Sequence, residues 1–187
     1  GATSMKLKNF LFIGNHFKIN YNSKNQNKVG YFKIEIEKIF TPYFLEDKIK
    51  LNCILYSHHL IKILTVENQS NINIYNHFYK LFDILNEKNW IKKFIFWELE
   101  IIKQVGYDIN FNDYIDKDDL KNSHSYVKTF DGSKEIPVFL LSKKNTDINN
   151  DELKDGLRIV GDFLNKSVLI PNNINYPLSR TEFIKLI

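Results

Sequence analysis

The sequence has little cysteine and little arginine: Cys53 is the only cysteine among 187 residues, and Arg158 and Arg180 are the only arginines. A single cysteine excludes an internal disulfide and a cysteine-cluster zinc site, and it is typical of a reducing compartment. Long apolar runs are also missing. The most apolar stretch, Phe94 to Val105, is interrupted by charged side chains and is shorter than the ~20 residues that span a membrane. These absences predict a cytoplasmic protein that does not enter a membrane.

Motifs of the common enzyme classes are absent as well. The sequence has neither a phosphate-binding glycine loop nor a serine-centred elbow. Cys53 lies five and six residues before His58 and His59, whereas a helical metal or nucleophile pair needs a spacing of three or four. The acidic residues from 113 to 119 lack the glycine and closing glutamate of a calcium loop. We therefore predict no metal, no cofactor and no enzymatic activity.

Positive charge is concentrated near the N-terminus. Residues 1–37 contain six lysines against two glutamates, a net +4 that equals the formal charge of the whole chain. The remaining residues therefore sum to zero. Such a patch is typical of a surface that binds polyanions, although exposed lysines also serve simply to keep a protein soluble.

Two segments alternate apolar and polar residues, as strands do. His16 to Tyr21 and Gly30 to Lys38 are separated by a polar turn, which predicts a β-hairpin. A two-stranded hairpin is marginal in water, so we expect these strands to lean on more sheet or on helices.

From residue 45 onward the apolar period becomes helical. We expect helices near 45–67, 75–85, 90–105 and 151–164, a short last helix from 179, and irregular structure with short strands from 108 to 150. The third helix is apolar nearly all round and should be central. Gly106 is placed to end it in a left-handed conformation, with Tyr107 folding back. The predicted apolar stripes are Ile49, Cys53, Tyr56 and Leu60; Tyr75, Phe78, Phe82 and Leu85; and Leu153, Leu157, Val160 and Leu164.

Several segments, in order, resemble the RecO family of recombination mediators. The central one, Phe96 to Phe111, has an aromatic-Glu-Leu triplet, aliphatic positions and a Gly-aromatic stop. The other similar segments are Gly1 to Ser4, Leu11 to Asn15 with Ile13 where proline is usual, Val29 to Glu35, Gly156 to Leu164, and Leu178 to Arg180. The last two are most similar to alphaproteobacterial members.

The resemblance implies an α+β fold: a partial N-terminal OB-fold β module followed by a mostly α-helical domain. Residues 1–40 would be the C-terminal part of the barrel, with the sequence starting partway through it. Residues 41–187 would be the RecO-type helical domain, with an irregular insertion around 108–150. Many members carry a four-cysteine zinc site there, but residues 110–136 contain no cysteine.

The resemblance also implies a non-enzymatic function in DNA repair at the nucleoid. Such a mediator binds single- and double-stranded DNA, prefers single strands, and promotes annealing and recombinase loading with RecR and RecF. An OB module binds strands through basic grooves and stacking aromatics, each stack contributing about 1 to 3 kcal/mol. The residues we expect to contact DNA are Lys6, Lys8, Lys18, Lys24, Lys28, Lys33, Tyr21 and Tyr31. The alternative is a helical adaptor that binds proteins and no nucleic acid.

A second site is expected on the helical domain, for partners that include the acidic, apolar C-terminal tail of single-stranded-DNA-binding protein. Such a tail needs an apolar surface bordered by positive charge. The residues with suitable chemistry are Lys92, Lys93, Phe96 and Lys103. Phe96 stands where the family commonly has arginine, and neighbouring Phe94 and Trp97 are more typical of core.

Overall fold

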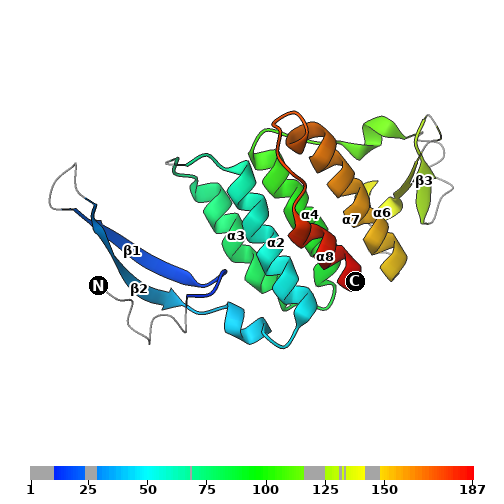
Figure 1. The fold of residues 1–187 in the computed structure, drawn as a ribbon. Coiled ribbons are helices and arrows are strands. Elements are labelled where there is room, and N and C mark those ends of the chain that lie inside the picture. Colours follow the sequence, from blue (N-terminus) through cyan, green and yellow to red (C-terminus); the bar gives the residue numbers. More distant parts are fainter. Residues whose placement is uncertain are drawn as a thin grey trace.

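Most of the chain is described by a computed structural model, which covers residues 11–23, 29–67, 69–115, 125–130, 132, 134–141 and 148–187. Figure 1 shows a β-hairpin at one end, a body of helices in the middle, and a small second hairpin at the opposite end. Short strands followed by mostly helices confirm the predicted α+β class.

The N-terminal hairpin consists of β1 (His16–Asn22) and β2 (Tyr31–Lys38), which pair antiparallel. The register sets Ile19 opposite Ile34 and Tyr21 opposite Phe32. Because successive residues of a strand point to opposite faces, one face is apolar and the other carries the charges. The predicted strands and their alternation are confirmed.

The helical body contains the five longer helices of the described residues: α2 (Lys48–Leu64), α3 (Ile72–Leu85), α4 (Trp90–Gln104), α7 (Asn150–Leu164) and α8 (Leu178–Leu186). Asp47 caps α2, its side chain accepting from the backbone N–H groups of Ile49 and Lys50 at 3.1 and 3.0 Å. Asn149 and Glu152 form a reciprocal capping box at the start of α7. Local sequence signals therefore fix where α2 and α7 begin.

Helix α4 is the central helix, as predicted, packing against α2, α3 and α7. The helix ends at Gln104, and two residues later Gly106 has a left-handed φ of 97°. The backbone N–H of Gly106 donates to Lys103 O at 2.9 Å, and that of Tyr107 donates to Ile102 O at 3.1 Å. This is the Schellman pattern, which confirms the expected stop.

The described chain also contains shorter helices and strands. They are η1 (Thr41–Phe44), η2 (Phe111–Tyr114), β3 (Tyr126–Lys128), β4 (Glu135–Pro137), α6 (Val138–Leu141) and η3 (Asn165–Leu169), the last a π turn that continues α7. Strands β3 and β4 pair antiparallel and form the second hairpin. The apolar run at 138–141 is a short helix, although short strands were expected in this region. No helix in the part of the chain that the structure describes is long and apolar enough to cross a membrane.

One expectation about packing was wrong, and a second is met only at the base of the N-terminal hairpin. Tyr75 was assigned to the buried stripe of the second helix, but it is 45% exposed and Ile74 is buried in its place. The N-terminal hairpin was expected to lie on further sheet or on helices. In the described residues it touches the helices only at its base, and its outer part projects away from the body (Figure 1).

Candidate nucleic-acid and partner interface

The polar face of the N-terminal hairpin brings together three of the predicted DNA-contacting residues. Lys18, Tyr31 and Lys33 occupy alternating positions that point to the same side, and all three are exposed. Glu35 lies opposite Lys18 and forms an ion pair with Lys33 at 2.8 Å. The hydrogen bond to Lys33, with its charge, lowers the pKa of Glu35. A carboxylate therefore lies between the two lysines and reduces the positive potential of this face.

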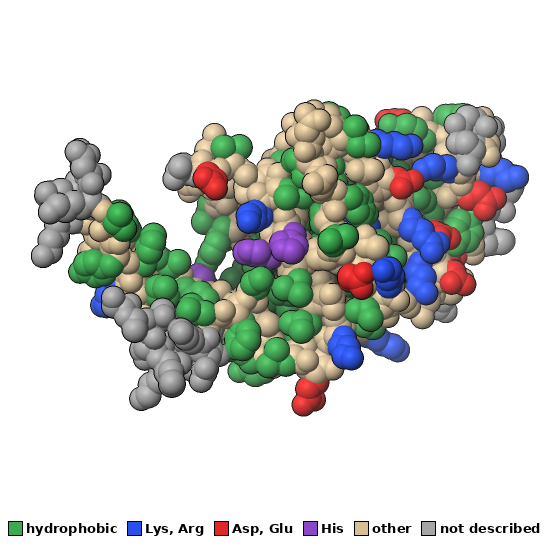
Figure 2. All heavy atoms as spheres, viewed as in Figure 1, with side chains coloured by type: hydrophobic (Ala, Val, Ile, Leu, Met, Phe, Trp, Pro, Cys, Tyr) green, Lys and Arg blue, Asp and Glu red, His purple; other side chains and the backbone are tan. Residues whose placement is uncertain are grey.

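Tyr21 lies on the opposite, apolar face of the same hairpin. Its ring is 5.1 Å from the ring of Phe32, centroid to centroid, and both side chains are more than half exposed. Ile19 and Ile36 extend this apolar face, which is visible in Figure 2. Tyr21 and Tyr31 therefore cannot stack on bases from the same side. Phe32, which the sequence-based selection left out, shares a face with Tyr21.

The remaining predicted DNA contacts, Lys6, Lys8, Lys24 and Lys28, lie outside the described residues. Their role stays a prediction.

Asn15 fixes the hairpin to the helical body. Its side-chain oxygen accepts from the backbone N–H groups of Phe40 and Thr41 at 2.8 and 3.0 Å, and the Thr41 hydroxyl donates to Ile13 O. Gly14 between them has a φ of 95°, and a Cβ there would lie 2.6 Å from the Thr41 hydroxyl oxygen. Only glycine fits this position, so the tripeptide Ile13-Gly14-Asn15 joins the start of β1 to the start of η1.

Aromatic contacts complete the base of the hairpin. The Tyr75 hydroxyl lies 2.6 Å from Nε2 of His16, and the Lys38 ammonium donates to the Tyr79 hydroxyl. The ring of Phe40 stacks on that of Phe82 with centroids 4.1 Å apart. Tyr75 is thus occupied by the hairpin, which explains why it is not in the core.

The predicted partner-binding residues share one face of α4. At 100° per residue, Lys92, Lys93, Phe96 and Lys103 fall within about 100° of arc. Phe96 is 36% exposed, and its ring meets that of Phe139 edge-on at 6.2 Å. Lys93 pairs with Glu87, and Lys103 pairs with Asp108 at 3.0 Å. Phe94 and Trp97 are buried as expected. We refer to this surface as the outer face of α4.

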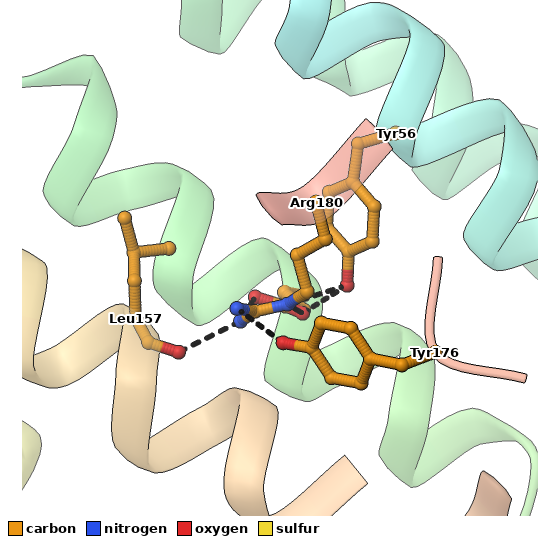
Figure 3. A network of polar contacts seen from close by, with 5 residues as sticks. Tyr56, Leu157, Tyr176 and Arg180 are labelled. Carbon is orange, nitrogen blue, oxygen red and sulfur yellow. Dashed lines mark hydrogen bonds and ion pairs between the residues drawn. The ribbon is translucent and has the colours of Figure 1, made fainter. Parts of the chain in front are cut away.

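A buried ion pair that sequence reasoning missed lies on the opposite side of α4. Arg180 of α8 donates from Nη2 to Glu98 at 2.9 Å and to the Leu157 carbonyl at 2.8 Å (Figure 3). Its Nε donates to Glu98 and to the Tyr56 hydroxyl, both at 3.1 Å, and Nη1 donates to Tyr176 at 3.1 Å. Both charged side chains have no exposed surface. The network therefore connects α2, α4, α7 and α8.

Electrostatics within the network keep the arginine charged and the tyrosine neutral. Burial alone lowers the pKa of Arg180, but Glu98, Tyr56 and Tyr176 together more than offset this and raise it. Burial raises the pKa of Tyr56 well above its ordinary value, and the negative charge of Glu98 adds to the effect. The signal that could have found this site is Glu98 itself, because a charge inside so apolar a helix needs a partner.

The residues considered for catalysis or metal binding are not brought together. Cys53 is buried, which raises the pKa of its thiol. His59 contacts the Ser179 hydroxyl through Nδ1 at 2.8 Å. The described residues contain no group of three or more histidines, cysteines or carboxylates that could hold a metal ion. Residues 116–124 lie outside the description, so the expected absence of a metal stays a prediction.

Comparison with known proteins gives a consistent answer. Seven curated proteins match, all named DNA repair protein RecO. The protein of Ehrlichia chaffeensis is 25% identical over 206 residues, covering 98% of this chain and 83% of its own length. Those of Rhodospirillum centenum and Rickettsia canadensis are 21% and 26% identical, with 98% and 100% of this chain and 79% and 81% of their own length covered. Over nearly its whole length the chain is similar to proteins named DNA repair protein RecO. No family profile and no solved structure matches it.

The segments that carry the RecO resemblance have physical roles in this fold. The aromatic-Glu-Leu triplet supplies Glu98, and the segment from Leu178 to Arg180 supplies its partner. Gly161 is the residue of α7 that faces Arg180: a Cβ there would be 2.5 Å from the Tyr176 hydroxyl and 2.6 Å from Nη1 of Arg180. Gly156, in the same RecO-like segment, leaves room for the Phe139 ring, which a Cβ would meet at 2.5 Å. These RecO-like segments therefore build the core.

Proposed function

We propose that this chain functions in DNA repair and recombination as a non-enzymatic mediator that binds DNA and recruits protein partners. The observation that carries the proposal is the similarity, over nearly the whole chain, to proteins named DNA repair protein RecO. In this proposal the chain prefers single strands, also binds double strands, and promotes annealing and recombinase loading with RecR and RecF. No bond is made or broken, so the mechanism needs no cofactor.

The polar face of the N-terminal hairpin supports contact with DNA. Lys18 and Lys33 would neutralise phosphates, and Tyr31 between them and the turn would stack on a base. The hairpin projects from the helical body, so a strand can approach this face (Figure 1). Lysine contacts with phosphate release counterions, so affinity for single strands should fall with salt at a log-log slope of about 0.7 per neutralised phosphate.

The outer face of α4 supports contact with a protein tail. Exposed Phe96 supplies apolar surface, and Lys92, Lys93 and Lys103 on the same face supply positive charge, which the exposed carboxylate of Glu100 on this face reduces. An acidic peptide with an apolar end, such as the C-terminal tail of single-stranded-DNA-binding protein, matches this chemistry. Lys93 and Lys103 each have an acidic neighbour, which such a peptide would have to displace.

Fluorescence anisotropy with a labelled single-stranded oligonucleotide tests the DNA contact. The variant Lys18→Glu/Lys33→Glu should bind at least several-fold more weakly and show a smaller salt slope. The matched control is Lys62→Glu/Lys80→Glu, which makes the same charge change at exposed positions of α2 and α3. Equal binding by wild type and both variants would place the DNA contact away from this face, and no binding by the wild type would favour the alternative function, a helical adaptor without nucleic-acid contact.

A further inference from the structure

A pocket of about 420 Å³ opens between the second hairpin and α7. The second hairpin lies at the end of the molecule opposite the N-terminal hairpin (Figure 1). Its apolar walls come from Phe111, Ile136, Ile159 and Phe163. The volume lies in the range of about 300 to 1,000 Å³ that is typical of ligand pockets. The pocket shares no residue with the polar face of the N-terminal hairpin or with the outer face of α4.

Two aromatic rings at the mouth of this pocket are exposed. Tyr114 is 54% and Phe130 is 70% exposed. Their backbones are joined, since the N–H of Phe130 donates to Tyr114 O at 2.9 Å and Ile115 bridges to Thr129. The two rings therefore have a fixed backbone spacing. Exposed aromatic surface beside a pocket is typical of a binding site.

The polar groups around the mouth are mixed in sign. Lys134 pairs with Asp162, and Asp113 and Lys166 also line the pocket, so the four charges sum to zero. Lys166 is exposed and forms no ion pair within the described part of the chain. It lies on the π turn η3, and such turns are frequent at functional sites.

This combination selects a particular ligand chemistry. Apolar walls and exposed rings favour a flat, aromatic ligand, while carboxylates and ammonium groups together favour an edge with both donors and acceptors. A nucleobase has this chemistry: carboxylates accept from its exocyclic amino groups, and lysine donates to its ring acceptors. An acidic peptide is disfavoured by Asp113 and Asp162, and an aliphatic side chain would leave the charged groups unused.

We propose that the pocket bounded by Tyr114, Phe130 and Lys166 binds one unstacked base of a single-stranded nucleic acid. Lys166 contacts the adjoining phosphate, and the exposed rings stack on the base. The inference rests on the proposed function, in that the chain binds single strands, and adds a contact far from the N-terminal hairpin.

The salt dependence of binding separates this contact from the lysine contacts. In the full chain, Phe130→Ala should lower affinity for a single-stranded oligonucleotide about 10-fold and leave the salt slope unchanged, because stacking releases no counterions. Lys166→Met should reduce both affinity and slope. The control is Tyr43→Ala, which removes a ring that is 82% exposed on η1, away from the pocket. Wild-type affinity in Phe130→Ala, or an equal loss in Tyr43→Ala, would overturn the proposal.

A probe for stacking makes the test independent of overall affinity. An oligonucleotide that contains 2-aminopurine should change its fluorescence on binding to the wild type, because the base leaves its neighbours and stacks on the protein rings, and should change less with Phe130→Ala. Phe130→Leu, which retains apolar bulk without an aromatic face, replaces that variant if alanine lowers the thermal unfolding midpoint. A fluorescence change that persists in Lys18→Glu/Lys33→Glu but not in Phe130→Ala would support the pocket even if the hairpin contact fails. Competition by an acidic peptide that depends on Phe130 would instead assign the pocket to a protein partner.

Discussion

Two ion pairs in this molecule have nearly the same length and opposite surroundings. Arg180 and Glu98 are 2.9 Å apart with no exposed surface, whereas Lys33 and Glu35 are 2.8 Å apart and about half or more exposed. The buried pair cannot be separated without leaving a charge in the core, while water and salt screen the exposed pair. Distance alone therefore does not decide what an ion pair contributes. The buried pair of Arg180 and Glu98 fixes the arrangement of the helices. The exposed pair of Lys33 and Glu35 leaves its charges available to a ligand.

The aromatic residues also divide into a buried group in the helical body and an exposed group on the N-terminal hairpin. Tyr56, Phe94 and Phe183 are completely buried around the Arg180 network, and their rings pack against one another. On the N-terminal hairpin, Tyr31 and Phe32 are about two-thirds exposed. The body is thus built for stability, and the hairpin presents surface.

The largest expected effect comes from separating the buried pair. Arg180→Met should lower the free energy of unfolding by about 3 to 5 kcal/mol, because Glu98 is left charged and buried without its partner. Urea denaturation measures this change. The double variant Glu98→Gln/Arg180→Met should recover part of the loss. A loss of only about 1 kcal/mol, the scale of an exposed pair, would contradict the contrast between the two regions.

The junction between the two regions should show an intermediate effect. Asn15→Ala removes the acceptor for the half-buried backbone N–H of Phe40 and for that of Thr41, at a cost of about 1 to 3 kcal/mol. Hydrogen exchange should show faster exchange at these two amides and little change in α4. Asn20→Ala, at an exposed position of β1, is the control. Equal acceleration throughout α4 would mean that hairpin and body unfold as one unit.

A smaller effect is expected from histidine protonation in the body. Burial lowers the pKa of His77 below its ordinary value of 6.5, and burial does the same for His58. The unfolded chain therefore binds protons more tightly than the folded chain. The contribution of these two neutral histidines to the free energy of unfolding is therefore fully present above pH 6.5, and it declines as the pH falls below 6.5. Urea midpoints on both sides of pH 6.5 measure the decline, which His77→Gln should flatten. A midpoint that rises on acidification would show that the sign is wrong.

The smallest effect on stability, and a gain in binding, is expected in the hairpin. Glu35→Gln removes the carboxylate between Lys18 and Lys33, so affinity for single strands should rise several-fold. The salt slope should steepen by about 0.7 for each phosphate gained, while the unfolding midpoint stays unchanged. Glu182→Gln, which breaks an exposed pair with Lys185 on α8, is the control. Unaltered affinity in Glu35→Gln would place the DNA contact elsewhere.

Local sequence signals were sufficient for the longer elements, although they missed the short helix at 138–141. The strand alternation, the apolar period of α4 and the stop at Gly106 all depend on neighbouring residues, and each was predicted. Tyr75 was misassigned because its environment is set by His16, which is distant in sequence. The Arg180 network was missed for the same reason: its two charges are 82 residues apart. Periodicity carries no information about such pairs.

The candidate interface was only partly predictable. Residue type and charge pointed to Lys18, Lys33, Tyr21 and Tyr31, but the pairing register separates the two tyrosines onto opposite faces. The long polar turn between the strands left this register open in the sequence. The pocket beside Phe130 combines residues from η2, the second hairpin and α7, so it became visible only in three dimensions.

The position of Arg180 also affects how this chain is made. A ribosome synthesises Glu98 long before Arg180, and during that interval the carboxylate has no cationic partner. Helices α2, α3 and α4 can form as they emerge, but their close packing must wait until α8 has been translated. We therefore expect the nascent chain to remain loosely packed around Glu98 until Arg180 is available to pair with it.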